Sequence, residues 1–533
     1  MNSALTWICL AAIAAGFLLG LPNLDLAPFW VDETVAVTPA LSIHEHGFPT
    51  TRFDLDFMPW QLEYGLWDPA TPLYRYAVAG FTAVFGFSEF TTRLFSLLMA
   101  VACAAALFVL VRGLYDAKTG LAAAALMMAS PTTLVFAREA RHFTFVMFLS
   151  LCTLACLHAA ARDRAGAGSG RDRGDAARVL WFAFAVALLL SQTLGYLFLP
   201  VIGAYVLVND PRRFFSRRHW PAYVAAAAVY AGVMAVFWNT LPFFHVTDCS
   251  NREAGCEPEW SFYPNVLRFF LAPMVELYMV RLQRAWSLQH LLFAVGVAVV
   301  AADVWRRRRE LPWSSLLLLW LLIPPVLLSS QEVKFPRYLF IWSAPVCALL
   351  VAVAIVRIAA RFGGRRPLAE VALVVLALLS PRLLDVGTWQ EPRWRPRLGV
   401  IDSFRRNVRH PDGDNVYRIR WQVGMIRANA AAGDEVVTSL DDPSLQYYLA
   451  RPVHGFLNSR HTDAYFVDLL DRAQAEGRAV WFIDSLPHWN HCLTDEPEPR
   501  SIDCREKYAG FYARCTEVSR EGAPTCRRIP LQP

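Results

Sequence analysis

Charged residues are scarce in this chain of 533 residues: Asp, Glu, Lys and Arg together make up 18%, whereas 55% of the residues are hydrophobic. Soluble globular proteins carry more charge, at about 25% of their residues. Apolar runs of about 20 residues recur along positions 1–384, and each is long enough to cross the hydrocarbon core of a bilayer. The composition therefore excludes an ordinary soluble enzyme and predicts a polytopic α-helical membrane protein.

The first apolar run, from about Ala4 to Leu21, lacks the basic residues and the small-residue cleavage site of a secretory signal peptide. We therefore expect it to remain in place as a helix. Basic residues gather in short linkers after the even-numbered runs, as in Arg162–Arg178 and Arg306–Arg309. This distribution is typical of cytoplasmic loops. The net charge of +6 consequently gives no reason to expect a nucleic-acid partner.

The loop pattern is consistent with about eleven spans and a cytoplasmic N-terminus. The expected spans are 4–21, 90–111, 121–136, 143–161, 179–193, 196–208, 223–241, 288–304, 313–328, 338–359 and 368–384. Residues 22–88 form the first outer loop, whose mixture of aromatic and charged residues favours short interfacial helices. An odd number of spans places everything after Leu384 on the non-cytoplasmic face. We therefore expect a membrane domain at 1–384 and an exported domain at 385–533.

The chain after Leu384 alternates strand-like runs, such as Glu435–Thr438 and Ala479–Ile483, with helix-like stretches such as Ala464–Glu476. That alternation predicts a small α/β domain. Its cysteines are Cys492, Cys504, Cys515 and Cys526, and no pair has the Cys-x-x-Cys spacing of a zinc site. Together with Cys249 and Cys256 in an outer loop, they indicate disulfides in an oxidising compartment, with the connectivity left open. The cysteines within apolar runs are expected to be buried as hydrophobic residues: Cys9, Cys103, Cys152, Cys156 and Cys347.

An acidic pair follows the first span directly, in the stretch Phe29-Trp30-Val31-Asp32-Glu33. Carboxylates at the edge of a bilayer are costly and are usually functional. Two basic clusters lie at the same depth on the outer side, where the topology predicts few basic residues: Arg138 with Arg141, and Lys334 with Arg337. Arginine suits a lipid-linked phosphate through paired charge-assisted hydrogen bonds.

These motifs occur in a defined order: Asp32-Glu33, Pro72-Leu73-Tyr74, Ser88-Glu89-Phe90 with Arg93, Ser130-Pro131, Arg138-Glu139-Ala140-Arg141, and Phe335-Pro336-Arg337-Tyr338. In this order and placement they resemble the GT-C superfamily of integral-membrane glycosyltransferases, in particular the protein mannosyltransferase and aminoarabinose transferase branch. The resemblance covers roughly residues 1–390. It implies transfer of a sugar from a polyprenyl-phosphate donor to a lipid, glycan or protein acceptor on the non-cytoplasmic face.

The resemblance also implies roles for individual residues. Asp32 would be the catalytic base or the carboxylate that holds a metal, and Glu33 would support it or the acceptor site. Arg141 and Arg337 would hold the donor phosphate, with the neighbouring Arg138 and Lys334 as secondary candidates. A divalent metal is the one cofactor that this reading leaves open.

The candidates for binding the acceptor or a metal are less specific: Glu63, Asp68, His142 and His245. His142 follows the Glu-Ala-Arg motif where relatives often have an aromatic residue. Two other functions stay open, namely transport of a polyprenyl-linked sugar and a non-catalytic membrane scaffold. The absence of an internal repeat between the two halves of the chain disfavours the transporter. The Arg-rich loops and exported cysteines favour a bacterial inner membrane with a periplasmic C-terminal domain.

Overall fold

The computed structural model describes residues 3–22, 24–25, 29, 31–47, 49, 72–162, 171–191, 193–215, 217–236, 288–329, 336–379, 422–438, 442–455, 462–483, 491–493, 501–503, 506, 508–520 and 526–529. Some side chains within these ranges are also outside the description, and those of Asp32 and Arg337 are among them.

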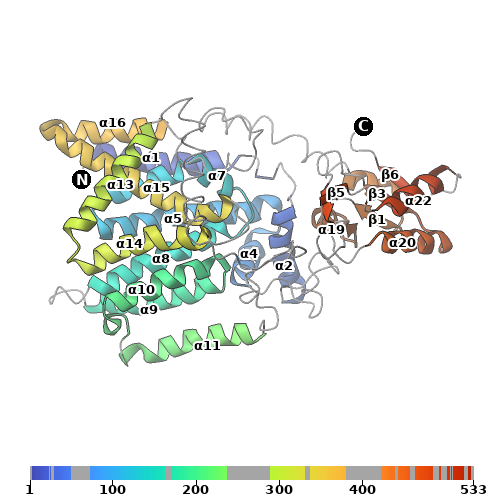
Figure 1. The fold of residues 1–533 in the computed structure, drawn as a ribbon, viewed down its shortest axis with the longest axis horizontal. Coiled ribbons are helices and arrows are strands. Elements are labelled where there is room, and N and C mark those ends of the chain that lie inside the picture. The colour runs from blue at the N-terminus through green and yellow to red at the C-terminus, as the bar shows by residue number, and fades with distance from the viewer. Residues whose placement is uncertain are drawn as a thin grey trace.

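The described part of the first 379 residues is almost entirely helical (Figure 1). Its helices are α1 (Ser3–Gly20), α2 (Val31–His46), α4 (Pro72–Phe85), α5 (Glu89–Leu114), α6 (Ala117–Met128), α7 (Pro131–Ala137), α8 (Phe143–Arg162), α9 (Arg171–Leu189), α10 (Leu199–Val208), α11 (Trp220–Val236), α13 (Leu288–Arg306), α14 (Leu311–Ser329), α15 (Pro336–Ala359) and α16 (Arg366–Leu379). Within the described ranges, four helical segments are long and apolar enough to cross a membrane. The chain is thus a polytopic helical membrane protein, and the count of about eleven spans stays a prediction.

One expected span and one expected linker differ from the structure. The run 121–136 is divided into α6 and α7, because Pro131 stands in the first turn of α7 and lacks the N–H that a continuous helix would need. Helix α9 begins at Arg171, so the second half of the expected flexible linker 162–178 is helical rather than irregular.

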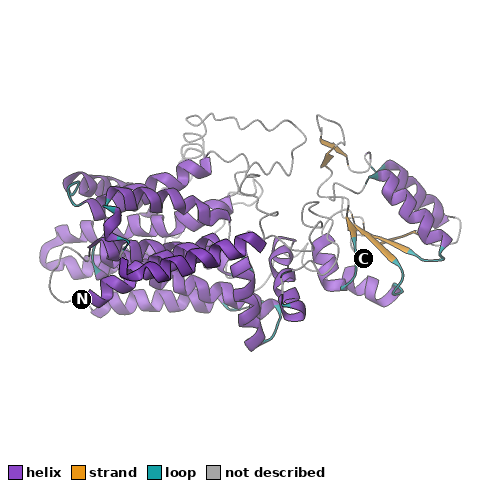
Figure 2. Ribbon diagram, turned by 90° about the horizontal axis from the view of Figure 1, so that it is seen from below, coloured by secondary structure: helices purple, strands orange, loops and turns teal. Residues whose placement is uncertain are grey.

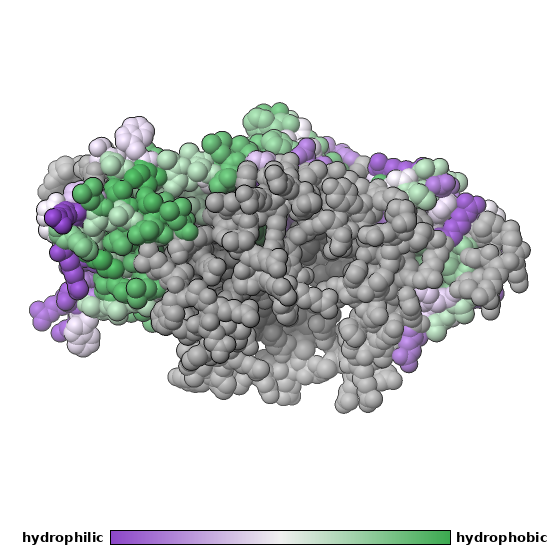
Figure 3. All heavy atoms as spheres, turned by 90° about the horizontal axis from the view of Figure 1, so that it is seen from above, coloured by the Kyte–Doolittle hydropathy of each residue, from purple (hydrophilic) through white to green (hydrophobic). Residues whose placement is uncertain are grey.

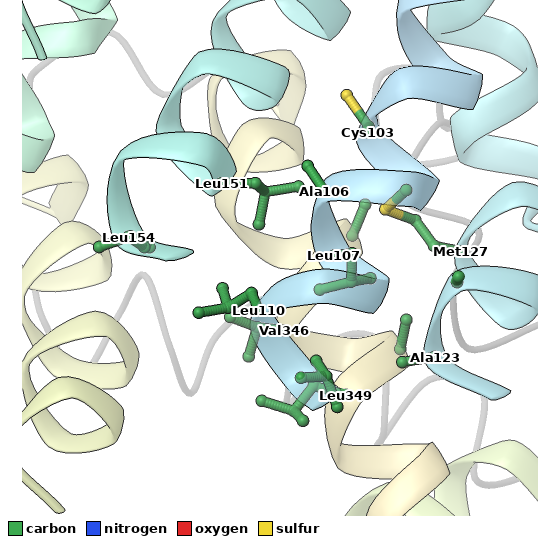
Figure 4. Packing of buried hydrophobic residues seen from close by; sticks show 14 of the residues in the cluster. Cys103, Ala106, Leu107, Leu110, Ala123, Met127, Leu151, Leu154, Val346 and Leu349 are labelled. Atoms are coloured by element: carbon green, nitrogen blue, oxygen red, sulfur yellow. The ribbon is translucent and has the colours of Figure 1, made fainter. Parts of the chain in front are cut away.

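The centre of the bundle is a single apolar core made by α5, α6, α8 and α15. Figure 4 shows Leu107 and Leu110 of α5 lying between Met127 of α6, Leu151 of α8 and Leu349 of α15. Burial alone gives little driving force inside a bilayer, so close packing and small residues bring the helices together. A Cβ on Gly296 of α13 would lie 2.1 Å from the carbonyl oxygen of Leu350. Helix α13 therefore packs against α15 through a glycine that no larger residue can replace without displacement.

The surface of the bundle is consistent with a lipid environment. Figure 3 shows apolar residues gathered over the helices and hydrophilic residues at the far end of the bundle and on the C-terminal region. Ion pairs tie helices together away from the candidate site: Arg357 Nη2 lies 2.8 Å from Asp303 Oδ2, and Lys118 Nζ lies 3.1 Å from the fully buried Glu370. Figure 1 shows α2 and α4 at the end of the bundle that lies next to the C-terminal region.

The C-terminal region, residues 422–529, contains β1 (Glu435–Thr438), α19 (Asp442–Leu449), β2 (His454–Gly455), α20 (Asp463–Ala475), β3 (Val480–Ile483), β4 (His491–Leu493), β5 (Ser501–Asp503), α22 (Ala509–Arg520) and β6 (Cys526–Ile529). Strands β2-β1-β3-β6 form a parallel sheet in that order, and β4 pairs with β5 antiparallel (Figure 2). Helices α20 and α22 pack on the sheet through Phe466 and Phe511. A disulfide joins Cys515 to Cys526. The cysteines expected in the apolar runs are free, and Cys9 and Cys103 are buried.

Candidate active site

The acidic segment enters helix α2 at the end of the bundle that lies next to the C-terminal region. Asp32 and Glu33 stand in the first turn of α2, where the partial positive charge of a helix N-terminus favours carboxylates. The Glu33 carboxylate is 1% exposed and is hydrogen bonded on both oxygens. Arg93 donates from Nε to Oε1 at 2.8 Å and from Nη2 to Oε2 at 2.6 Å. The backbone N–H of Ala140 donates to Oε1 at 2.7 Å.

Glu33 therefore joins three parts of the chain that are distant in sequence. Arg93 belongs to α5, and Ala140 belongs to the turn between α7 and α8, 107 positions after Glu33. Arg93 extends the junction further, because its Nη1 donates to the carbonyl of Leu24 at 2.6 Å. Its guanidinium also lies 5.1 Å from the centre of the Phe29 ring. In the sequence, Arg93 stands in the motif that begins with Ser88-Glu89-Phe90, but the motif alone predicted no role for it.

The Arg138–Arg141 turn lies beside Glu33, because its third residue is Ala140, whose N–H donates to the Glu33 carboxylate. Arg138 donates from Nη1 to the carbonyl oxygens of Gly20 at 2.9 Å and Pro22 at 2.8 Å, and so holds the end of α1. Arg141 is 9% exposed, with its guanidinium 4.6 Å from the centre of the Phe143 ring. Its backbone carbonyl accepts from Ser96 Oγ at 3.4 Å.

Helix α4 brings two further polar side chains to this place. Tyr74 and Arg75 are 1% and 2% exposed, respectively. The Tyr74 phenol lies within electrostatic range of Glu33, Arg141 and Arg75. The ring of His142 packs edge-on against that of Tyr74, with 6.0 Å between their centroids. Sequence reasoning missed Arg75, although a charged residue within an otherwise apolar helix was a usable signal.

The structure places the remaining candidates to different degrees. Arg337 stands in the first turn of α15, and Phe340 of the next turn stacks on Phe136 of α7 with 4.5 Å between centroids. The backbone of Arg337 therefore lies near the end of α7, close to the Arg138–Arg141 turn. The other candidates lie outside the described residues: Lys334, Glu63, Asp68 and His245.

A metal centre would need several oxygen, nitrogen or sulfur ligands at one place. Among the described residues, no group of three or more His, Cys, Asp or Glu side chains could hold an ion. Glu33 is already bound to Arg93 and Ala140, so it is a poor metal ligand in this arrangement. We therefore derive no chemical step through a metal.

Comparison with known proteins identifies the class of fold. Residues 69–238 match the model of the family described as Dolichyl-phosphate-mannose-protein mannosyltransferase. No curated protein matches the sequence. In three dimensions the chain is similar to ArnT from Cupriavidus metallidurans bound to undecaprenyl phosphate, with a TM-score of 0.56 and 15% identity over 84% of this chain and 85% of that chain.

Two archaeal structures are similar as well. The Archaeoglobus fulgidus oligosaccharyltransferase in complex with Zn and sulfate has a TM-score of 0.53 at 15% identity, over 83% of this chain and 62% of that chain. AglB from the same organism, in complex with an inhibitory peptide and a dolichol-phosphate, has a TM-score of 0.52 at 15% identity, over 84% and 64%. The chain thus spans less than two thirds of the archaeal proteins. The comparisons confirm the expected resemblance to the GT-C superfamily at the level of the fold.

Proposed function

We propose that the protein is a glycosyltransferase that moves a sugar from a polyprenyl-phosphate donor to a lipid, glycan or protein acceptor. The observation that carries this proposal is the Glu33–Ala140 hydrogen bond of 2.7 Å. It brings the acidic segment and the Arg138–Arg141 turn together at one end of the bundle. A carboxylate pair beside arginines at a bilayer edge provides a base and a phosphate-binding group in one place.

The family match and the fold support the choice of donor. The ArnT structure contains undecaprenyl phosphate and the AglB structure contains a dolichol-phosphate, and both lipids carry the phosphate that a sugar donor would release. The family model that matches residues 69–238 is named for a dolichyl-phosphate-mannose-dependent reaction. By this analogy, the donor phosphate binds at Arg141 and Arg337, with Arg138 and Lys334 nearby.

The reaction is a displacement at the anomeric carbon of the donor sugar. The acceptor oxygen forms a bond to that carbon, and the bond from the carbon to the phosphate oxygen breaks with its electron pair. The acceptor proton passes to the Asp32 carboxylate, and polyprenyl phosphate leaves as a dianion. Preorganised arginines stabilise the negative charge that develops on the phosphate. Glu33, fixed by Arg93, positions the helix turn from which Asp32 acts.

Domain arrangement and location follow from the same proposal. Residues 1–384 form the transferase domain with its first outer loop at 22–88, and residues 385–533 form an α/β domain on the non-cytoplasmic face. The N-terminus is cytoplasmic, and the membrane is a bacterial inner membrane. A divalent metal would be held by Asp32 and by ligands outside the described residues, where Glu63, Asp68 and His245 are the candidates.

The test is transfer of radiolabelled sugar from a panel of undecaprenyl-phosphate sugars in membranes that contain wild type or Asp32→Asn. We expect wild type to transfer and Asp32→Asn to lose at least about 100-fold in rate, because a positioned general base contributes that much. Asp25→Asn is the matched control, since it makes the same change at an exposed position between α1 and α2. Normal transfer by Asp32→Asn would move the active site elsewhere. Wild type that binds undecaprenyl phosphate but transfers from no donor would overturn the proposal.

A further inference from the structure

Helix α19 of the C-terminal region carries, in its last turn, two tyrosines that contact the described part of the first 379 residues. The hydroxyl of Tyr448 accepts a hydrogen bond from the backbone N–H of Phe29 at 2.5 Å. The same hydroxyl donates to Oε1 of Glu89 at 3.0 Å. These contacts join residues 419 and 359 positions apart. Figure 1 shows α19 on the side of the C-terminal region that lies next to α2.

The neighbouring Tyr447 completes the contact. Its ring packs edge-on against the ring of Phe29 with 5.4 Å between centroids. Phe29 is fully buried, and Val37 of α2 and Ala140 belong to the same apolar cluster. The Arg93 guanidinium lies 5.1 Å from the centroid of that Phe29 ring. Phe29 therefore contacts the C-terminal region, α2 and α5 at once.

The two partners of the Tyr448 hydroxyl, Glu89 and Phe29, stand at or just before the start of a helix. Glu89 is the first residue of α5, where the helix N-terminus favours a carboxylate, and Ser88 caps that helix. Burial raises the pKa of the Tyr448 phenol, so the hydroxyl keeps the proton that it donates to Glu89. On the other side, Phe29 lies just before α2, which begins at Val31. An amide and a ring held at Phe29 define where the chain enters the helix that carries Asp32 and Glu33.

The contacts form a continuous path from the C-terminal region to the acidic pair. Tyr448 and Tyr447 hold Phe29, the Phe29 ring lies beside Arg93, and Arg93 binds Glu33 through two hydrogen bonds. Each step is a buried or half-buried contact between residues distant in sequence. Loss of the contact at Phe29 would loosen the first turn of α2 directly. The path therefore requires no movement of the C-terminal region relative to the helical bundle.

We propose that Tyr447 and Tyr448 are positioning residues of the active site, through which the C-terminal region sets the geometry of the Asp32–Glu33 segment. The catalytic consequence rests on the glycosyltransferase function proposed above. The contact itself does not depend on that function. In this view the C-terminal region completes the site.

The first experiment measures hydrogen exchange in the full-length protein in lipid nanodiscs. Tyr448→Phe removes the hydroxyl and keeps the ring. We expect the Phe29 amide to exchange about 3- to 10-fold faster in this variant, as the loss of one hydrogen bond predicts. Tyr465→Phe is the matched control, because its hydroxyl bonds to His454 within the C-terminal region. Unchanged exchange at Phe29 in Tyr448→Phe would overturn the proposal.

The second experiment measures sugar transfer with the same variants. Because the donor phosphate site at Arg141 is untouched, we expect Tyr448→Phe to lower kcat about tenfold and to leave the KM for the donor unchanged. A kcat equal to that of wild type, with faster exchange at Phe29, would show that the contact is merely structural. If wild type transfers no sugar, the glycosyltransferase function fails, and the exchange at Phe29 alone decides whether the contact holds the segment.

A second variant serves if Tyr448→Phe does not fold. Glu89→Ala removes the acceptor of the Tyr448 hydroxyl and leaves both tyrosines in place. We expect faster exchange at Phe29 in this variant too, since Tyr448 then loses the group that orients its hydroxyl. Protection equal to that of wild type in Glu89→Ala would contradict the proposed path.

Discussion

The Glu33 carboxylate and the Arg93 guanidinium, 60 positions apart in the chain, meet through two hydrogen bonds of 2.8 and 2.6 Å. Both side chains are buried, at 1% and 6% exposure. A paired geometry of this kind is specific in orientation, and its two charges have left water at a high cost. Glu33 is therefore suited to positioning, which agrees with the proposal that its neighbour Asp32 accepts the proton.

Breaking this pair on one side should destabilise the protein severely. Arg93→Leu leaves the Glu33 charge buried with its main partner gone, and we expect a loss of about 3–5 kcal/mol. The measurement is the apparent Tm of the purified protein in detergent. The double variant Glu33→Leu with Arg93→Leu should recover part of the loss, because no unpaired charge then remains. A double variant that loses more stability than the two single variants lose together would contradict this account.

The two arginines of the turn after α7 should respond differently to substitution. Arg141→Ala removes a proposed phosphate ligand, and we expect binding of undecaprenyl phosphate to weaken about 10- to 100-fold, as the loss of a charged hydrogen bond predicts. Arg138→Ala should mainly lower the Tm, since Arg138 holds the carbonyls of Gly20 and Pro22. Both variants are measured by lipid titration and thermal melting. Stronger loss of lipid binding in Arg138→Ala than in Arg141→Ala would reverse the assignment.

The contact of α13 with α15 should depend on the size of residue 296. Gly296→Leu places side-chain atoms where a Cβ alone would lie 2.1 Å from the Leu350 carbonyl oxygen. We expect a loss of at least about 1–3 kcal/mol from overpacking, because the backbone must shift. Gly203→Leu is the matched control, since nothing lies within 4 Å of its Cβ position. Thermal melting compares the two, and equal Tm values would show that α13 is free to move.

The stability of the C-terminal region should depend on pH through Glu435. A hydrogen bond with His454, aided by the Arg478 charge, holds the pKa of Glu435 below its ordinary value of 4.5. A lowered carboxyl pKa means that the folded state favours the ionised form. Its contribution is therefore complete above about pH 4.5 and is lost as the pH falls through the lower folded value.

The variant Glu435→Gln tests this dependence. We expect it to lower the Tm of the C-terminal transition slightly at pH 7 and to flatten the change in Tm below pH 4.5. Asp468→Asn is the control, because Asp468 is an exposed carboxylate on α20 that forms a surface ion pair with Arg472, and such pairs contribute little to stability. If the Tm of Glu435→Gln changes with pH as that of wild type does below pH 4.5, another carboxylate governs the loss of stability at acid pH.

The sequence by itself determined the membrane class and most helix positions. Lipid satisfies no backbone polar groups, so membrane spans are mostly helical and apolar, and such runs are visible in the sequence. The expected spans 4–21, 90–111 and 143–161 agree closely with α1, α5 and α8. The order and placement of the motifs that contain Asp32, Arg138 and Arg337 also indicated the GT-C resemblance. Local pattern was sufficient for each of these conclusions.

The tertiary structure alone decided which of those residues meet. The Glu33–Arg93 pair, the Glu33–Ala140 hydrogen bond and the Tyr448 contact with Phe29 each join segments separated by tens to hundreds of residues. No local periodicity encodes such pairings, because they arise only when helices and the C-terminal region pack. Burial then changes what each group does: it turns Glu33 into a structural carboxylate and a pair of C-terminal tyrosines into neighbours of the acidic segment.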